Sequence, residues 1–210
     1  MAVHADDAPQ RLLALGDSYT IGEDVAEDGR WPVQLAALLR GEGMAVEPPT
    51  VVARTGWTTD ELSAAMDDAT FAPPYDLVTL LIGVNNQYRG RPLDEYEAQF
   101  DALLVRAIEL AGHRAGRVLV LSIPDWGVTP FAAKSGRDVA RIGAELDAFN
   151  RSAAAISAGR GVAFVDITPI SRDPGAQPAM IAADGLHPSA AQYALWAQRA
   201  LPVARRLLAR

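Results

Sequence analysis

A serine at the end of an apolar run is the first residue in this sequence that could act as a nucleophile. Residues 11–15 read RLLAL, and the run breaks at Gly16-Asp17-Ser18. An apolar strand followed by this turn would place the Ser18 hydroxyl at the carboxyl edge of a sheet, where open α/β sheets hold their ligands. A serine hydroxyl attacks a carbonyl only when a general base lies within hydrogen-bond reach. The rest of the chain must supply that base and a group that orients it.

Three histidines are available as the base. His4 lies in the terminal segment, and His113 closes a long predicted helix, where the helix dipole favours a cation. His187 follows Asp184 by three residues, a spacing that lets one carboxylate accept the imidazole N–H within a tight turn. Elimination selects His187 as the base and Asp184 as its orienter. Taken singly, Asp184 and Ser18 could instead be helix caps.

Strands and helices must alternate to bring these residues together. We predict strands over residues 11–15, 46–53, 76–82, 117–123 and 162–167, and helices over 31–40, 58–68, 93–113, 138–158 and from 189 onward. Near-continuous apolar strands alternating with helices are typical of a parallel sheet covered on both faces. The carboxyl ends of such strands share one edge. Ser18, Gly56, Asn85, the loop at 124–126 and the segment 184–187 would converge there.

Composition narrows the class of protein. The 210 residues carry a net charge of −7 and are 50% hydrophobic, without cysteine. These values favour one globular domain, with residues 1–10 a flexible N-terminus and residues 11–210 the domain. They argue against a nucleic-acid partner and thiolate chemistry. No integral membrane segment is expected, because no apolar run in the sequence approaches about 18 residues. Residues 1–10 do not resemble a signal peptide. We expect a cytoplasmic protein, or a secreted or periplasmic one if a leader has been removed. The oligomeric state is left open.

Four short motifs carry a family resemblance. Gly16-Asp17-Ser18, Gly56, Gly83-Val84-Asn85 and Asp184-Gly185-Leu186-His187 resemble the four motif blocks of SGNH hydrolases, also called GDSL-type esterases and lipases. The resemblance covers residues 11–200 and implies a flavodoxin-like three-layer α/β/α sandwich with a five-stranded parallel sheet of order 2-1-3-4-5. Two positions depart from the common motifs. Tyr19 stands where leucine is usual, and Asn86, which we interpret as adjusting a turn, stands where aspartate is usual.

The resemblance implies a serine hydrolase that cleaves carboxylic esters through an acyl-enzyme intermediate. Ser18, Asp184 and His187 would form the catalytic triad. The backbone N–H groups of Ser18 and Gly56 and the side-chain amide of Asn85 would form the oxyanion hole. No metal and no organic cofactor is implied. We expect Asp17 to hold the turn through backbone N–H groups without itself being catalytic.

The substrate is less well defined than the reaction. Loops too short for an extended lipid tunnel favour a small-molecule ester with a short to medium acyl chain. Tyr88, Trp126 and Phe131, from the loops after the third and fourth strands, are candidate pocket residues. The same triad would also serve a thioesterase or lysophospholipase, or a carbohydrate O-deacetylase. An alternative from another class is a non-catalytic, flavodoxin-like module that binds an anion.

Overall fold

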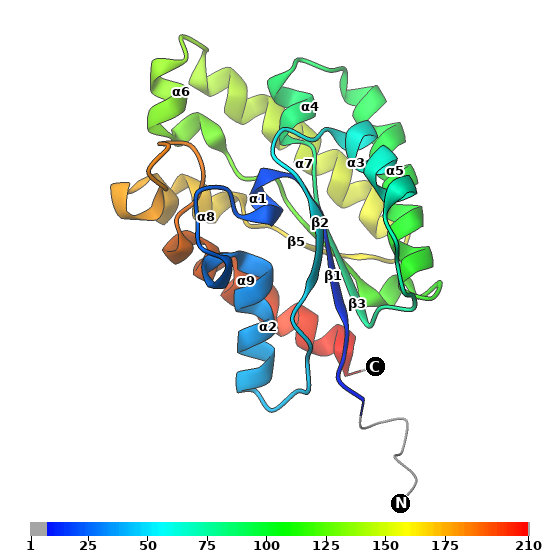
Figure 1. Ribbon diagram of the computed structural model, residues 1–210. Coiled ribbons are helices and arrows are strands. Elements are labelled where there is room, and N and C mark those ends of the chain that lie inside the picture. The colour runs from blue at the N-terminus through cyan, green and yellow to red at the C-terminus, as the bar shows by residue number, and fades with distance from the viewer. Residues whose placement is uncertain (1–7, 210) are drawn as a thin grey trace, which may run out of the picture.

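Five parallel strands form a single sheet in the computed structural model, which describes residues 8–209 (Figure 1). The strands are β1 (Leu12–Gly16), β2 (Thr50–Ala53), β3 (Leu77–Leu81), β4 (Val118–Leu121) and β5 (Ala163–Val165). Their order is β2-β1-β3-β4-β5, and every neighbouring pair is parallel. The predicted sheet and its order are therefore confirmed. The carboxyl ends of all five strands lie at the same edge of the sheet, the upper edge in Figure 1, near α4.

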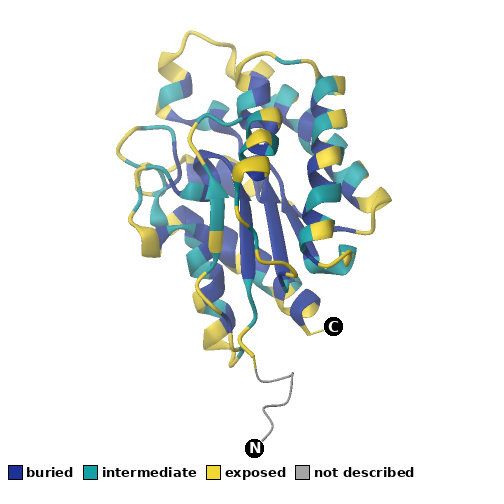
Figure 2. Cartoon of the chain, turned by 45° about the vertical axis from the view of Figure 1, so that its right-hand side comes forward, coloured by how far each residue is buried: buried dark blue, intermediate teal, exposed yellow. Residues whose placement is uncertain are grey.

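Long helices cover both faces of the sheet. Helices α2 (Trp31–Gly41) and α9 (Ala190–Leu208) pack together on one face, and α3 (Thr59–Asp68), α5 (Leu93–Leu110) and α7 (Val139–Gly159) lie on the other (Figure 1). Their buried sides face the strands, and β1, β3 and β4 are buried along their whole length (Figure 2). Two-sided burial explains why these strands are continuous apolar runs. The arrangement is the expected three-layer sandwich.

Short helices occupy several segments that the sequence analysis treats as loops. They are α1 (Ser18–Ile21), α4 (Val84–Tyr88), α6 (Pro130–Lys134) and α8 (Thr168–Arg172), with 3-10 turns at Glu27–Gly29, Ala115–Arg117, Trp126–Val128, Pro174–Ala176 and Pro178–Met180. Helices of one turn are too short to show a hydrophobic period. Three of the α-helical turns follow β1, β3 and β5 closely, so they shape the edge where the site lies.

The second strand is shorter than its predicted range of 46–53. Pro48 and Pro49 lack the N–H groups that a ladder needs, and β2 begins only at Thr50. Val46 instead makes an isolated parallel bridge with Gln10, whose N–H donates to the Ala45 carbonyl at 2.7 Å. Gln10, the last residue of the predicted flexible terminus, is thus held beside the sheet, whereas residues 1–7, His4 included, lie outside the described residues. Between residues 8 and 209, no helix has the length and apolar character to cross a membrane.

Candidate active site

Ser18 is the first residue of α1, and only Asp17 separates it from the end of β1. The turn depends on the absence of a side chain at Gly16. A Cβ atom there would lie 2.2 Å from Thr20 Oγ1 and 2.4 Å from the Leu81 carbonyl oxygen. Only glycine therefore lets β1 pass into α1 in the space between β3 and the helix. The result is a serine that is 5% exposed and stands at the carboxyl edge of a central strand.

Asp17 caps α1. Its Oδ1 accepts the N–H of Tyr19 at 3.0 Å, which is the turn-holding contact expected for this residue. The other oxygen, Oδ2, is buried and has no hydrogen-bond partner among the described residues. Complete burial raises the pKa of Asp17 to about 7, even though the hydrogen bond from Tyr19 opposes the shift. The residue beside the candidate nucleophile is therefore a carboxyl group that is poorly solvated when charged.

Asp184 and His187 lie in one turn and contact each other. Asp184 Oδ2 is hydrogen-bonded to His187 Nδ1, and Asp184 Oδ1 accepts the N–H groups of Leu186 at 2.8 Å and of His187 at 2.9 Å. Burial raises the pKa of Asp184, but these hydrogen bonds outweigh it and hold the pKa below its usual value. Because Nδ1 is engaged by the carboxylate, Nε2 is the ring nitrogen that remains to accept a proton.

One cavity of about 230 Å³ brings the predicted site residues together. Its walls come from the segments that follow β1, β2, β3 and β4 and from the turn at 184–187. They comprise Ser18, Tyr19, Thr55, Gly56, Val84, Asn85, Tyr88, Trp126, Phe131, Leu186 and His187. Asp184 lies behind His187. The structure thus places Ser18, His187, both further predicted oxyanion donors and all three predicted pocket residues around the same space.

Two consecutive asparagines join the segments that carry the predicted oxyanion donors. The Asn85 side chain donates to the Trp57 carbonyl oxygen at 2.9 Å. Asn86 accepts the N–H of Thr59 at 3.1 Å and donates to the Thr59 hydroxyl at 2.7 Å. Asn86 is fully buried. It links the start of α4 to the start of α3, a larger role than the turn adjustment suggested by its sequence position.

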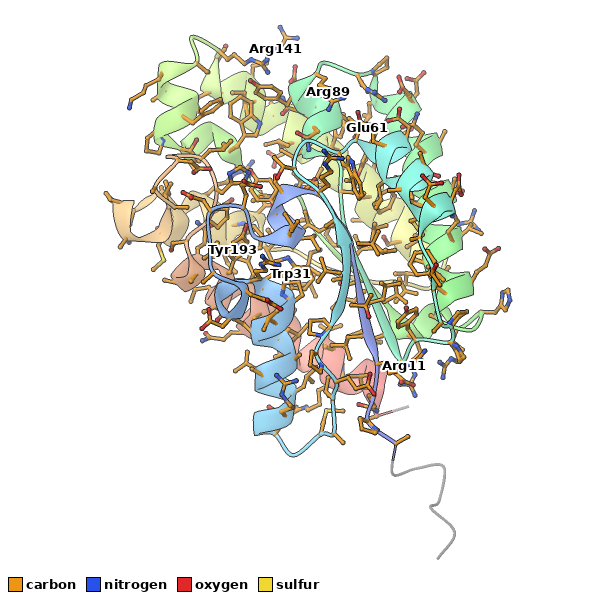
Figure 3. All side chains as sticks on the ribbon, in the orientation of Figure 1. Arg11, Trp31, Glu61, Arg89, Arg141 and Tyr193 are labelled. Carbon is orange, nitrogen blue, oxygen red and sulfur yellow. The ribbon has the colours of Figure 1, made fainter. Side chains whose placement is uncertain are left out.

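Gly56 has a backbone requirement of its own. Its φ is +86°, in the region that favours glycine. Space is not the constraint, because an added Cβ would meet only Arg89 Nη2, at 3.8 Å. Arg89 also donates from Nη2 to the Gly56 carbonyl oxygen at 2.7 Å and pairs with Glu61 at 3.1 Å; Arg89 and Glu61 are labelled in Figure 3. Arg89 was not among the predicted site residues, although it follows Asn85 by one helical turn.

Tyr19 packs against the candidate base. Its ring meets the His187 imidazole edge-on with centroids 5.5 Å apart, and the centroid of the Trp196 ring lies 6.0 Å from that of Tyr19. Tyr19 is 3% exposed. Burial raises its pKa far above the usual value for tyrosine, so the phenol stays neutral. The departure from leucine at this position therefore supplies an aromatic wall to the imidazole.

The three predicted pocket residues form an aromatic cluster around Trp126. The ring centroids of Tyr88 and Phe131 lie 5.3 and 6.1 Å from that of Trp126. Trp126 is 2% exposed, and its Nε1 donates to Gln87 Oε1 at 2.8 Å. The indole orientation is fixed by this hydrogen bond, so one wall of the cavity is rigid and apolar.

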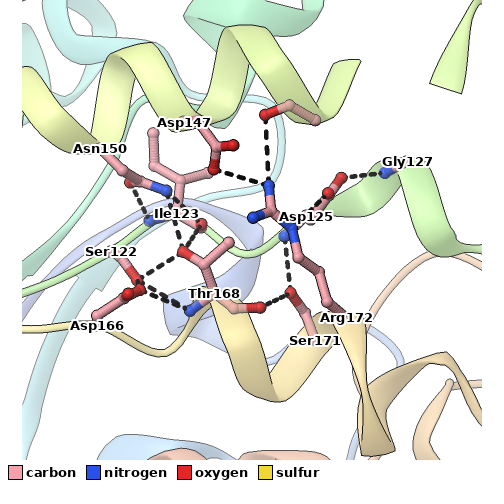
Figure 4. Close-up of polar contacts among 11 residues, drawn as sticks. Ser122, Ile123, Asp125, Gly127, Asp147, Asn150, Asp166, Thr168, Ser171 and Arg172 are labelled. Atoms are coloured by element: carbon pink, nitrogen blue, oxygen red, sulfur yellow. Dashed lines mark hydrogen bonds and ion pairs between the residues drawn. The ribbon is translucent and has the colours of Figure 1, made fainter. Parts of the chain in front are cut away.

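A polar network holds the loop that carries Trp126 (Figure 4). Asp125, which is buried, accepts the N–H of Gly127 at 2.8 Å and pairs with Arg172 at 2.9 Å. The backbone N–H of Asp125 donates to Ser171 Oγ at 2.9 Å, and Arg172 extends to Asp147 at 2.8 Å. These contacts tie the loop to α8 and α7. In the part of the chain that the structure describes, no group of three or more His, Cys, Asp or Glu side chains is placed to hold a metal ion.

This fold, with these residues around one cavity, is that of the SGNH class of hydrolases. A family model supports the assignment: the GDSL-like lipase/acylhydrolase model matches residues 14–195, and the chain belongs to this family. Family membership supports an ester-hydrolysing enzyme. No curated protein is a significant sequence match.

Solved structures share this fold over nearly the whole chain. TesA is 21% identical, with a TM-score of 0.70 over 94% of this chain and 99% of its own. Axe2, an acetylxylan esterase from Geobacillus stearothermophilus, is 21% identical, with a TM-score of 0.69 over 96% of both chains. The psychrotrophic esterase EstA from Pseudoalteromonas sp. is 16% identical, with a TM-score of 0.67 over 96% of this chain and 100% of its own. At these identities the likeness is one of fold.

Proposed function

We propose that this chain hydrolyses carboxylic esters, with Ser18 as nucleophile, His187 as general base and Asp184 as the group that orients the base. The observation that carries the proposal is the position of His187. Its Nδ1 is held by Asp184, and the imidazole lines the same cavity as Ser18. The lowered pKa of Asp184 keeps the carboxylate charged, as a group that stabilises an imidazolium must be.

The reaction proceeds in two halves. Ser18 Oγ attacks the ester carbonyl while His187 Nε2 takes the hydroxyl proton, and the same proton then passes to the departing alcohol. Water attacks the resulting acyl-serine with His187 again as the base. The carboxylic acid leaves and Ser18 regains its proton. No other reactant is required.

Three donors are proposed for the oxyanion. Ser18 begins α1, so its N–H is one of the first-turn amides that lack an intrahelical acceptor. Asn85 gives one amide hydrogen to Trp57, and an amide has a second to offer. The Gly56 N–H is the third, on the segment that Arg89 holds by its carbonyl oxygen. Loss of one such donor lowers kcat by about 100- to 1000-fold in serine hydrolases.

A short to medium acyl chain is proposed for the substrate. The cavity is small, and Val84, Trp126, Phe131 and Leu186 make much of its lining apolar. Acetyl to hexanoyl groups suit such a space, and the existence of an acetylxylan esterase with this fold makes acetylated sugars worth including among the substrates tested. Acyl thioesters and lysophospholipids are the other substrates that the same chemistry would accept.

The test combines a covalent probe with a substrate panel. A fluorophosphonate is expected to label the folded protein stoichiometrically at Ser18, and Ser18→Ala is expected to lose labelling and the hydrolysis of aryl esters. Ser152→Ala is the matched control, because Ser152 lies on α7 and bonds to Glu97. Wild-type turnover by Ser18→Ala would end the serine mechanism. Absence of labelling in folded protein would favour the anion-binding module. Rates on acetyl sugars, thioesters and lysophospholipids then rank the substrates.

A further inference from the structure

A second cavity of about 430 Å³ adjoins the first. The two share Tyr88, a residue that is 38% exposed. The second cavity is bounded by α4, by the start of α7 and by the segment that precedes α7. Its charged lining residues are Arg89, Arg137, Asp138, Arg141 and Glu145. It is a polar space next to an apolar one.

The carboxylates of the second cavity are already engaged. Glu145 accepts hydrogen bonds from Gln87 and from Arg141, both at 2.7 Å. Asp138 caps α7 by accepting the N–H groups of Ala140 and Arg141. Among the cations of the cavity, Arg89 is paired with Glu61, which lies outside it. Arg141, on α7, lies on the same side of the molecule as Arg89 in Figure 3.

Arg137 is the remaining charged side chain of the cavity. Its charge helps to lower the pKa of Glu145, although the two side chains do not form an ion pair. The Arg137 guanidinium stacks on the Tyr88 ring, 4.1 Å from the centroid, and lies 5.7 Å from the Trp126 ring. It donates to the Tyr88 carbonyl oxygen at 2.8 Å. Within residues 8–209, no carboxylate lies within ion-pair distance of it. A guanidinium has five N–H donors, so this one retains donors for a ligand.

We propose that the second cavity binds an anionic group carried by the alcohol part of the substrate, with Arg137 as its principal contact. The proposal rests on the proposed esterase function and assigns the two halves of the substrate to the two cavities. The acyl chain occupies the apolar cavity at Ser18. The alcohol part extends past Tyr88, where its carboxylate or phosphate meets Arg137.

The position of Arg137 suits this role. The Tyr88 ring and the Tyr88 carbonyl oxygen hold the guanidinium in place. A held guanidinium binds carboxylate or phosphate oxygens through two parallel hydrogen bonds. Tyr88 also lines the acyl cavity, so an anion on Arg137 also fixes the substrate relative to Ser18. The interaction is partly exposed, and added salt is expected to weaken it.

The test compares three esters of one acid whose alcohol parts differ in charge. The probes are butyrate esters of 4-hydroxybenzoate, of 4-hydroxybenzamide and of 4-hydroxyphenyl phosphate. For each variant we measure kcat/KM for an anionic ester and divide it by kcat/KM for the uncharged benzamide ester. Intrinsic differences between the leaving groups then cancel when variants are compared. Arg137→Gln is expected to lower this ratio by about 5- to 10-fold, and Arg137→Lys to restore part of it. Whichever ratio falls further in Arg137→Gln, that of the benzoate ester or that of the phosphate ester, identifies the anion that fits the site better.

Controls separate this proposal from the esterase function. Arg199→Gln removes the same charge from the exposed side of α9, which lines neither cavity, and should leave the ratio unchanged. Hydrolysis of the uncharged benzamide ester shows whether each variant is folded and catalytically active. An unchanged ratio in Arg137→Gln, with the neutral ester still turned over, would overturn the anion site. Failure to hydrolyse any of the three esters would instead refute the esterase function on which it rests.

Discussion

Arg89 donates a hydrogen bond from Nη2 to the carbonyl oxygen of Gly56 at 2.7 Å. Gly56 is a proposed oxyanion donor with a φ of +86°, and its N–H direction depends on how the backbone around it is held. Arg89 is fixed in turn by Glu61, which accepts the N–H of Thr58 in the capping box of α3. We therefore expect Arg89 to act as a positioning residue for the proposed oxyanion hole.

Arg89→Ala is expected to lower kcat by about 10-fold with little change in KM, because a misplaced donor loses part of the stabilisation that a removed donor loses entirely. Steady-state kinetics on a neutral aryl ester measure kcat and KM separately. Arg91→Ala is the matched control, since Arg91 pairs with Asp60 and Glu95 nearby. An equal fall in kcat in both variants would mean that Arg89 acts through general stability alone.

Asp17 should make the stability of the fold depend on pH. Its pKa is about 7 in the folded protein and near 3.8 in the unfolded chain. A raised carboxyl pKa contributes stability that is complete below pH 3.8 and lost as the pH rises through 7. Asp17→Asn keeps an acceptor for Tyr19 without a charge. Its free energy of unfolding relative to the wild type should therefore increase between pH 4 and 7, by at most about 4 kcal/mol.

Urea unfolding at several pH values in this range measures the effect. Asp68→Asn, a change on the exposed side of α3, serves as the control and should give a constant difference from the wild type. A constant difference for Asp17→Asn as well would show that Asp17 is ionised in the folded protein throughout the range.

Arg172 should stabilise the loop that carries Trp126. Arg172→Ala leaves the buried Asp125 carboxylate with only the Gly127 N–H among its contacts in Figure 4. Because the arginine is partly exposed and water reaches its place, we expect a loss of about 2 kcal/mol in the free energy of unfolding, below the range for fully buried pairs. Urea unfolding at pH 7 measures it.

An exposed ion pair provides the comparison for Arg172. Arg160 pairs with Asp101 at the surface, and Arg160→Ala should cost less than about 1 kcal/mol. If the two variants were equally stable, the Arg172–Asp125 pair would be no more than a surface contact, and the Trp126 loop would be held by its other hydrogen bonds.

Tyr19 should support His187 through its ring and not through its hydroxyl. Tyr19→Phe keeps the edge-on contact with the imidazole and should stay within about 2-fold of wild-type kcat/KM. Tyr19→Leu, which introduces the residue common in related motifs, loses that contact and should lower kcat/KM by about 2- to 10-fold, since an aromatic pair contributes about 0.5–1.5 kcal/mol. An equal loss in Tyr19→Phe would assign the effect to the hydroxyl.

Much of the fold could be predicted because its signals are local. The apolar runs at 11–15 and 76–82 are continuous since β1 and β3 are buried on both faces, and strict alternation with long helices dictates a parallel sheet. The one-turn helices escaped prediction because helical periodicity needs more than one turn to appear. Helix α4 matters most among them, since it places Asn85, Gln87 and Tyr88 in three different contacts at the site.

The sequence by itself determined the parallel sheet and the residues gathered at its carboxyl edge, because strand direction brings Ser18, Gly56, Asn85 and His187 to one side for any course of the loops. The order of the strands was an expectation from the family resemblance, which the structure confirmed. Only the tertiary structure decided what holds those residues at that edge. Arg89 on Gly56, Tyr19 on His187 and Arg137 over Tyr88 are contacts made by side-chain direction across segments distant in the chain. The spacing of residues along a sequence does not determine where their side chains point. The supporting contacts and the second cavity are therefore seen only in the folded structure.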